Sequence, residues 1–278
     1  MKFLNHISRR KLMHWAGASA FLGGLLGRPA SARTVPFVDL AVTPSGEGLW
    51  VLDQAGQIHT LGAAPVLQDI PDGRPSPYVA LVPTPAGEGL YALTMDGQIN
   101  TFGATRVLAD QPDIRPLPFV DLAITPDGSG LWALDLLGRI RTFGSAPVFT
   151  DAPDTRPSPY VALVPTPTGG GLYALTMNGQ INTFGATRVL NDPPDTRPLP
   201  FVDLAITPDG LGLWALDLLG RIRTFGSAPV FVDTPDGRPS PYVALVPTPS
   251  GGGLYALNMR GQIRTSGDAR NFTTRGPV

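Results

Sequence analysis

The sequence is dominated by a 41-residue unit that is repeated six times at constant spacing. Its clearest copy runs from Pro118 to Ser158, and the third and fifth copies differ at only four of 41 positions. The six units begin at Pro36, Pro77, Pro118, Pro159, Pro200 and Pro241. Self-similarity at a fixed period of this length is typical of repeat architectures, so the repeat constrains the fold before any single residue is considered.

Each unit carries signals for four short antiparallel strands. In the third unit these are the segments 119–125, 131–135, 139–143 and 147–150. They are apolar and β-branched, and turn residues separate them. The second turn contains Asp96-Gly97 in unit two and Asn178-Gly179 in unit four. Such dipeptides suit the positive φ angles of a tight hairpin, so we expect a sharp reversal there.

Four antiparallel strands and a returning connector in 41 residues are the layout of one propeller blade. Proline, which cannot donate to a sheet ladder, falls in turns, in connectors and in the fourth run, which we expect at the exposed outer edge. We therefore predict an all-β chain that forms a six-bladed β-propeller of four-stranded antiparallel blades over residues 33–278. A β-solenoid is the main alternative, but its coils usually repeat at a shorter period.

The units alternate in type, so the true period is 82 residues and the ring has approximate three-fold symmetry. Odd units open with Phe-Val-Asp-Leu-Ala and even units with Tyr-Val-Ala-Leu-Val. One aromatic position is Trp50, Trp132 and Trp214 in odd units and Tyr91, Tyr173 and Tyr255 in even units. Because each blade has only its neighbours to cover its faces, we expect these rings in the core between blades.

Residues 1–32 have the features of a cleaved export signal. Ser8-Arg9-Arg10 resembles the start of the twin-arginine motif, and the apolar run that follows is too short to span a bilayer. Ala30-Ser31-Ala32 provides a small-x-small cleavage site. We expect export by the twin-arginine route, cleavage after Ala32 and a periplasmic or secreted mature protein. An ordinary secretory leader is the alternative.

Charge and composition exclude several functions for the mature chain. Five of the 21 basic residues but none of the 22 acidic ones lie in the leader, which leaves a net charge of −6. Such a balance argues against a nucleic-acid surface. The chain has no cysteine, which excludes disulfides, thiolate nucleophiles and cysteine-ligated metals. We expect no cofactor and no membrane span, and a monomer is the expected state.

Three aspartates form the most specific polar pattern in the sequence. Asp39, Asp121 and Asp203 occupy the first strand of each odd unit, where even units have alanine. The first strand of a propeller blade is innermost, so the three carboxylates are predicted to face the axis at three-fold positions. Like charges so placed raise one another's pKa, recruit arginines or hold a cation. The alternative is that each aspartate bonds a backbone amide or an arginine of the adjacent blade.

The remaining polar residues are best explained by structure. His59 is the one histidine after the leader, and its position holds Asn or Arg in other units, so we expect it to face solvent. Asp53, Asp135 and Asp217 are expected to cap the second turn. The connector pairs are also interpreted as structural; they are Asp72/Arg74, Asp113/Arg115, Asp154/Arg156, Asp195/Arg197 and Asp236/Arg238.

The repeat resembles those of known exported bacterial propellers. Leu-Ala-Ile-Thr-Pro-Asp-Gly-x-Gly-Leu-Trp-Ala-Leu-Asp and Gly-Arg-Ile-Arg-Thr-Phe-Gly-Ser-Ala are similar to the repeats of the YVTN and NHL types. This resemblance covers every blade and implies the fold and a binding or scaffold role for most members. It transfers no catalytic residue to this chain.

Three functions remain open at the level of sequence. The favoured one is a non-enzymatic binding scaffold that holds a protein, peptide or glycan on the face that gathers the connectors and second turns. The alternative is a hydrolase or lyase that acts on a polysaccharide or ester through axial Asp and Arg. The third is a structural repeat that forms assemblies.

Overall fold

The computed structural model describes residues 35–67, 76–108, 118–149, 158–190, 200–231 and 240–272. The predicted leader, with Ser8, Arg9, Arg10, Ala30 and Ala32, lies outside the described residues, as do the connector pairs. The segment from Phe37 to Val278 forms one compact unit, which is treated by itself below. The described residues include no helix with the length and hydropathy needed to cross a membrane.

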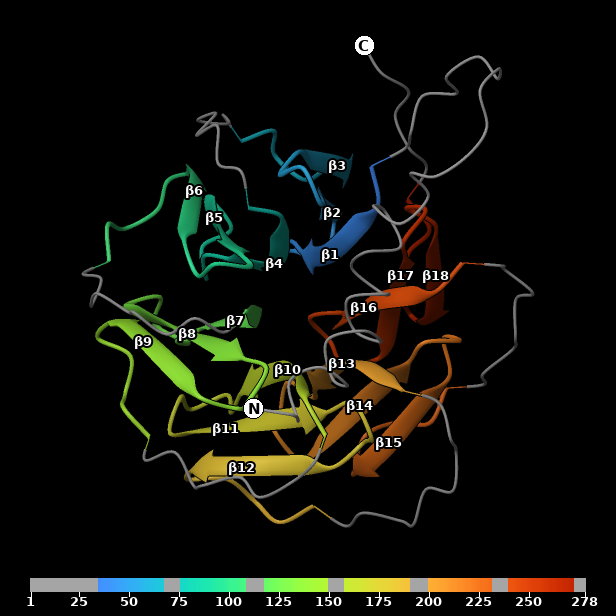
Figure 1. Cartoon of the computed structure of the whole chain (residues 1–278). Coiled ribbons are helices and arrows are strands. Elements are labelled where there is room, and N and C mark those ends of the chain that lie inside the picture. Colours follow the sequence, from blue (N-terminus) through green and yellow to red (C-terminus); the bar gives the residue numbers. More distant parts are fainter. Residues whose placement is uncertain are drawn as a thin grey trace, which may run out of the picture. The chain divides into compact units, whose positions relative to one another are not determined.

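Six three-stranded antiparallel sheets, one in each repeat, make up the described structure (Figure 1). The first strands are β1 (Phe37–Val42), β4 (Tyr78–Pro83), β7 (Phe119–Ile124), β10 (Tyr160–Pro165), β13 (Phe201–Ile206) and β16 (Tyr242–Pro247). The second strands are β2 (Gly48–Asp53), β5 (Gly89–Thr94), β8 (Gly130–Asp135), β11 (Gly171–Thr176), β14 (Gly212–Asp217) and β17 (Gly253–Asn258). The third strands are β3 (Ile58–Gly62), β6 (Ile99–Gly103), β9 (Ile140–Gly144), β12 (Ile181–Gly185), β15 (Ile222–Gly226) and β18 (Ile263–Gly267).

The first strands line the inside of the ring. Each first strand contacts the first strands of the two neighbouring sheets, and β16 contacts β1 in the same way (Figure 1). Backbone bonds also join successive sheets, from the Tyr78 amide to the Gln54 carbonyl at 3.2 Å and from the Phe37 amide to the Met259 carbonyl at 3.0 Å. The last bond links unit one to unit six. The arrangement is consistent with the six blades that the repeat predicts.

The prediction of four strands in each blade is wrong for the described residues. The segment predicted as the fourth strand is irregular, and its hydrogen bonds go to a side chain of the second strand. In odd units the Trp50 indole donates to the Pro65 carbonyl at 3.0 Å. In even units the Tyr91 hydroxyl donates to the Arg106 carbonyl and accepts from the Arg106 amide, both at 2.9 Å. These bonds, together with the missing amide of proline, replace a sheet ladder.

The core lies between the sheets, as the aromatic alternation predicts. All six residues of each second strand are buried, because both faces of that strand are covered by neighbouring blades. Trp132 packs with Tyr160 and Leu163 of the following unit, and Tyr173 packs with Phe201 and Leu204 in the same manner. The six Trp and Tyr side chains are at most 1% exposed.

The second turns differ in detail from the tight hairpin predicted for Asp-Gly and Asn-Gly. The Gly97 amide donates to the Thr94 carbonyl at 2.9 Å, which closes a four-residue turn. Gly97 has a φ of 88°, whereas no described residue other than glycine has a positive φ. Asp96 therefore does not adopt the left-handed conformation that the predicted type requires, and the glycine alone supplies the reversal.

Candidate functional site

The three predicted aspartates lie on the innermost strands, each directly after a β-bulge. In β1 the pairing passes from Phe37 opposite Asp53 to Asp39 opposite Leu52, so Val38 is the extra residue. The same shift occurs before Asp121 in β7 and before Asp203 in β13. A bulge redirects the side chain that follows it, which explains how a residue in a regular ladder can reach the next blade.

Each of these carboxylates accepts two backbone amides, one from its own blade and one from the next. Asp39 accepts from the Leu40 amide at 2.8 Å and from the Leu81 amide at 2.6 Å. Asp121 bonds Leu122 and Leu163 at 2.7 and 2.6 Å. Asp203 bonds Leu204 and Leu245 at 2.7 and 2.5 Å. The structure thus shows the alternative considered from the sequence, a bond to a backbone amide of the adjacent blade.

This geometry explains why aspartate occurs only in odd units. Six leucine amides, one in each first strand, need an acceptor that the sheet does not provide. One carboxylate has an oxygen for each of two amides, so three aspartates satisfy all six. Even units need no acceptor of their own and have a buried alanine at that position. The 82-residue period follows from this shared use.

Burial raises the pKa of all three carboxyl groups, and repulsion by neighbouring carboxylates adds to it at Asp39 and Asp203. Each aspartate keeps some exposed area, but the first strands surround its carboxylate, so desolvation is the largest cause. It raises the pKa of Asp121 to about 7, although the two amides lower it. The pKa of Asp39 is also raised, by burial and then by the charge of Asp121. Asp121 and then Asp39 add to the effect of burial on Asp203, whose pKa is raised as well.

The axial carboxylates do not form a ready-made metal site. Within the described ranges, no three His, Cys, Asp or Glu side chains lie together as a group able to hold a metal ion. A cation in the axial region would therefore not be held directly by all three carboxylates. Asp39, Asp121 and Asp203 remain predicted ligand-binding residues, and their observed hydrogen bonds connect neighbouring blades.

The aspartates at the second turn have the capping role predicted for them. Asp135 accepts from the amides of Leu137 and Arg139 at 2.9 and 3.0 Å, and its other oxygen pairs with the Arg139 guanidinium at 2.6 Å. In unit one the same oxygen of Asp53 lies 3.1 Å from Nε2 of His59, whose side chain is 44% exposed. His59 therefore belongs to a turn cap.

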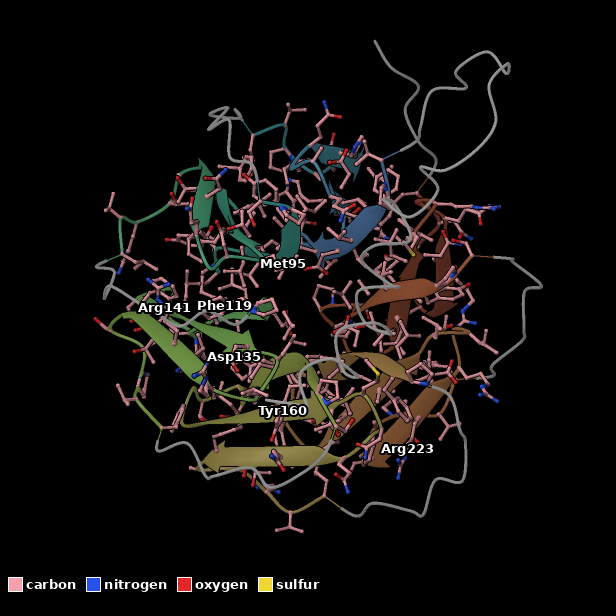
Figure 2. All side chains as sticks on the ribbon, viewed as in Figure 1. Met95, Phe119, Asp135, Arg141, Tyr160 and Arg223 are labelled. Atoms are coloured by element: carbon pink, nitrogen blue, oxygen red, sulfur yellow. The ribbon has the colours of Figure 1, made fainter. Side chains whose placement is uncertain are left out.

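His59 is exposed, as predicted, but the expectation that its position faces solvent in other units is wrong for units two, three and five, where Asn100, Arg141 and Arg223 are buried. Arg141 is only 8% exposed. Its guanidinium lies 4.6 Å from the centre of the Phe143 ring and donates to the Gly97 carbonyl of the preceding unit at 3.2 Å. Figure 2 shows Arg141 and its counterpart Arg223 on their third strands. The long side chain of Arg141 reaches the preceding blade, so the tolerance of this position for different residues misled the prediction.

The second turns carry a ring of mostly apolar side chains, which was not singled out from the sequence. The first residue of each turn, after the capping position, is half-buried; these residues are Gln54, Met95, Leu136, Met177, Leu218 and Met259. Five of the six are Met or Leu, and Figure 2 shows Met95 beside Phe119 of the following unit. The next residue is exposed, with Leu137 at 56% and Leu219 at 61%. We call the surface that carries these turns the second-turn face.

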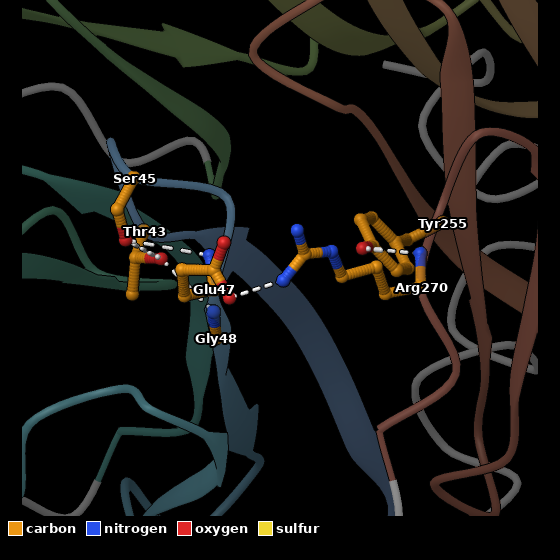
Figure 3. Close-up of polar contacts among 6 residues, drawn as sticks. All are labelled: Thr43, Ser45, Glu47, Gly48, Tyr255 and Arg270. Carbon is orange, nitrogen blue, oxygen red and sulfur yellow. Dashed lines mark hydrogen bonds and ion pairs between the residues drawn. The ribbon is translucent and has the colours of Figure 1, made fainter.

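The junction between units six and one has an ion pair that the other described junctions do not repeat, beside contacts that they share. Arg270 pairs with Glu47, and the Arg270 amide donates to the Tyr255 hydroxyl at 3.0 Å (Figure 3). The Phe272 ring stacks on Tyr255 and lies against Gly62 of unit one, where a Cβ would be only 2.5 Å from it. The atypical end of unit six therefore completes contacts with the start of the ring.

These features define the chain as a β-propeller repeat protein. It is similar to the β-propeller domain of Cps50 (Swd1) from Myceliophteria thermophila, with a TM-score of 0.57 and 12% identity over 84% of this chain and 96% of that one. At that identity the likeness shows the fold alone. No protein-family model and no curated protein sequence matches the chain.

Proposed function

We propose that this protein is an exported, non-enzymatic scaffold that binds a partner protein or peptide on its second-turn face. The observation that carries the proposal is the ring of methionine and leucine side chains on that face, with Leu137 and Leu219 more than half exposed. Methionine is flexible and polarizable, and methionine-rich surfaces adapt to different apolar partners. Clustered exposed apolar residues on a soluble domain mark interaction sites.

The polar groups of the described structure support binding rather than catalysis. Asp39, Asp121 and Asp203 have both carboxylate oxygens on backbone amides, and Asp53, Asp135 and Asp217 cap turns. A general acid, base or nucleophile needs a free atom that reaches the substrate. The propeller fold itself serves binding in many unrelated proteins and does not imply an activity.

A peptide library displayed on phage, panned against the immobilised chain from residue 33, provides a probe without knowledge of the natural partner. The affinity of selected peptides is then measured by calorimetry for Met95→Glu/Met177→Glu/Met259→Glu. The matched control is Val66→Glu/Val107→Glu/Val189→Glu. It places three charges in the segments that were predicted as fourth strands, at positions that are 84%, 102% and 99% exposed. We expect loss of at least tenfold in affinity for the methionine variant and no loss for the valine variant. Equal affinities would exclude the second-turn face.

The hydrolase or lyase alternative and the export route have their own tests. An activity screen on glycosides, esters and lactones tests the enzyme alternative, since turnover that disappears in Asp39→Asn/Asp121→Asn/Asp203→Asn would establish it.

For export, the full chain is expressed beside its Arg9→Lys/Arg10→Lys variant and the cells are fractionated. A wild-type product that stays in the cytoplasm would contradict the export proposal.

A further inference from the structure

We infer that the partner docks off the axis, on the sector of the second-turn face made by units five and six, through an apolar side chain next to a carboxylate. This sector comprises Leu218, Leu219, Arg221, Met259 and Arg260, and we call it the basic sector. The inference rests on the proposed function, because it names a place and a partner chemistry on the same face.

Three sectors of the face share one backbone arrangement. Each pairs the second turn of an odd unit with that of the following even unit. In each, the first strand of the even unit donates its opening amide to the turn of the odd unit, from Tyr78 to Gln54, from Tyr160 to Leu136 and from Tyr242 to Leu218, at 3.2, 3.0 and 3.0 Å. The sectors therefore differ in side chains and not in shape, which makes each a control for the others.

Charge distinguishes the three sectors. Arg260 is exposed, and in the described part of the chain its guanidinium has no ion-pair partner, while Arg221 is neutralised by Asp217 at 2.7 Å. The equivalent of Arg260 is the neutral Asn178 in the second sector and the acidic Asp96 in the first. The described turn residues thus carry an uncompensated positive charge in the basic sector alone.

Apolar exposure distinguishes them as well. The basic sector presents Leu219, 61% exposed, beside Leu218 and Met259, whereas the first sector has Ala55 and Gln54 at the corresponding positions. The second sector has Leu137 but lacks the cation. Among the three sectors, the basic sector alone therefore has an exposed leucine, a methionine and an arginine without an ion pair to another described residue.

This combination selects an acidic and apolar partner segment. A buried apolar anchor supplies most of the affinity of an interface, and a charge-assisted bond from arginine to a carboxylate fixes its orientation. The chain after the predicted leader has a net charge of −6, so an acidic segment is repelled by much of the remaining surface. Repulsion elsewhere and attraction at one sector together give specificity.

The test uses the library-selected peptides on the chain from residue 33. We expect them to contain Asp or Glu next to Leu, Ile, Phe or Met, to bind with one site per chain and to bind more weakly as salt increases. Arg260→Asp is expected to weaken binding at least tenfold, and Asn178→Asp, at the same position of the neutral sector, to leave it unchanged. Peptides without acidic residues, or binding that tolerates Arg260→Asp, would overturn the inference.

A gain of binding provides the stronger experiment. Gln54→Leu/Ala55→Leu/Asp96→Arg converts the first sector to the side chains of the basic sector on the same backbone. We expect the calorimetric stoichiometry to rise from one peptide per chain to two, and an unchanged stoichiometry counts against the inference. If the methionine variant loses binding but Arg260→Asp does not, the face is correct and the sector wrong. If neither variant loses binding, the proposed function fails too.

Discussion

The junction from unit three to unit four and the junction from unit two to unit three have the same backbone but different polar connections. In the first, Asp121 on the innermost strand bonds the Leu163 amide of the next unit at 2.6 Å. In the second, the first strand of unit two has Ala80 in place of an aspartate, and Arg141 on the third strand of unit three instead bonds the Gly97 carbonyl at 3.2 Å. Blades with the same backbone can therefore be joined at the axis or away from it, according to one side chain in each.

The largest expected effect comes from glycines that contact the aromatic residue of the next unit. Gly138 has a φ of 84° and a Cβ there would lie 2.3 Å from the Tyr160 ring; for Gly97 the values are 88° and 2.4 Å from Phe119. Valine at either site is expected to cost about 3 kcal/mol or more of unfolding free energy. Hydrogen exchange measures the protection of the Phe119 amide in Gly97→Val and of the Tyr160 amide in Gly138→Val. We expect the greater loss at Phe119, because the junction at Tyr160 is still held by the bond from Asp121 to the Leu163 amide. Equal losses of protection would show that the carboxylate does not make the two junctions differ in stability.

Removal of one axial carboxylate is expected to have the next largest effect. Asp121→Ala leaves the amides of Leu122 and Leu163 without their acceptor. The net loss of unfolding free energy should be about 2 kcal/mol, because relief of the repulsion between the carboxylates offsets part of the cost. Urea denaturation measures this cost. Glu88→Ala, which removes an exposed acid whose carboxylate has no bond to the other described residues, is the control. Similar midpoints for both variants would show that the axial bonds contribute little.

The raised pKa values predict an unusual dependence of stability on pH. A carboxyl group whose pKa is 3.8 in the unfolded chain and about 7 in the folded one, as for Asp121, stabilises the fold fully below pH 3.8 and loses this contribution as the pH rises through 7. The melting temperature of the wild type should therefore be higher at pH 5 than at pH 8. Asp39→Asn/Asp121→Asn/Asp203→Asn should lack this difference, and a variant with the wild-type slope would contradict the assignment.

The smallest expected effect is at the closing junction. Glu47 and Arg270 are 46% and 62% exposed, so their ion pair should contribute about 0.5 kcal/mol, and less at high salt. Phe272→Ala, which removes the ring that stacks on Tyr255, should cost several times more than Glu47→Gln. Thermal denaturation at two salt concentrations distinguishes the two contributions. A larger loss for Glu47→Gln would mean that the charge pair, and not the aromatic stack, closes the ring.

Much of the fold was predictable because repetition reveals it directly. The constant spacing, the glycine turns and the alternating Trp and Tyr predicted the sheets, their order and the core between them. The fourth strand was misjudged because Pro65 and Arg106 lie in an apolar run that looks like a strand, while the side chains of Trp50 and Tyr91 take its backbone bonds. A competition of that kind depends on the tertiary structure and leaves no local signal.

The candidate site was predictable in position but not in role. Spacing placed Asp39, Asp121 and Asp203 on inner strands, yet nothing local shows that a bulge directs each carboxylate to an amide 42 residues further on. The second-turn face was predicted as the binding face, but its ring of apolar side chains was not singled out, for a different reason. Its residues are ordinary turn residues in any one unit, and they form a surface only when six turns are gathered on one face.

The shared carboxylates also limit how this protein can change in length. A single unit added or lost would set two alanine-type blades or two aspartate-type blades next to each other. Two adjacent alanine-type blades leave one leucine amide without an acceptor. Two adjacent aspartate-type blades leave one carboxylate without a second amide donor. Duplication and deletion in this gene should therefore be tolerated in steps of 82 codons, and only rings with an even number of blades can satisfy every shared carboxylate.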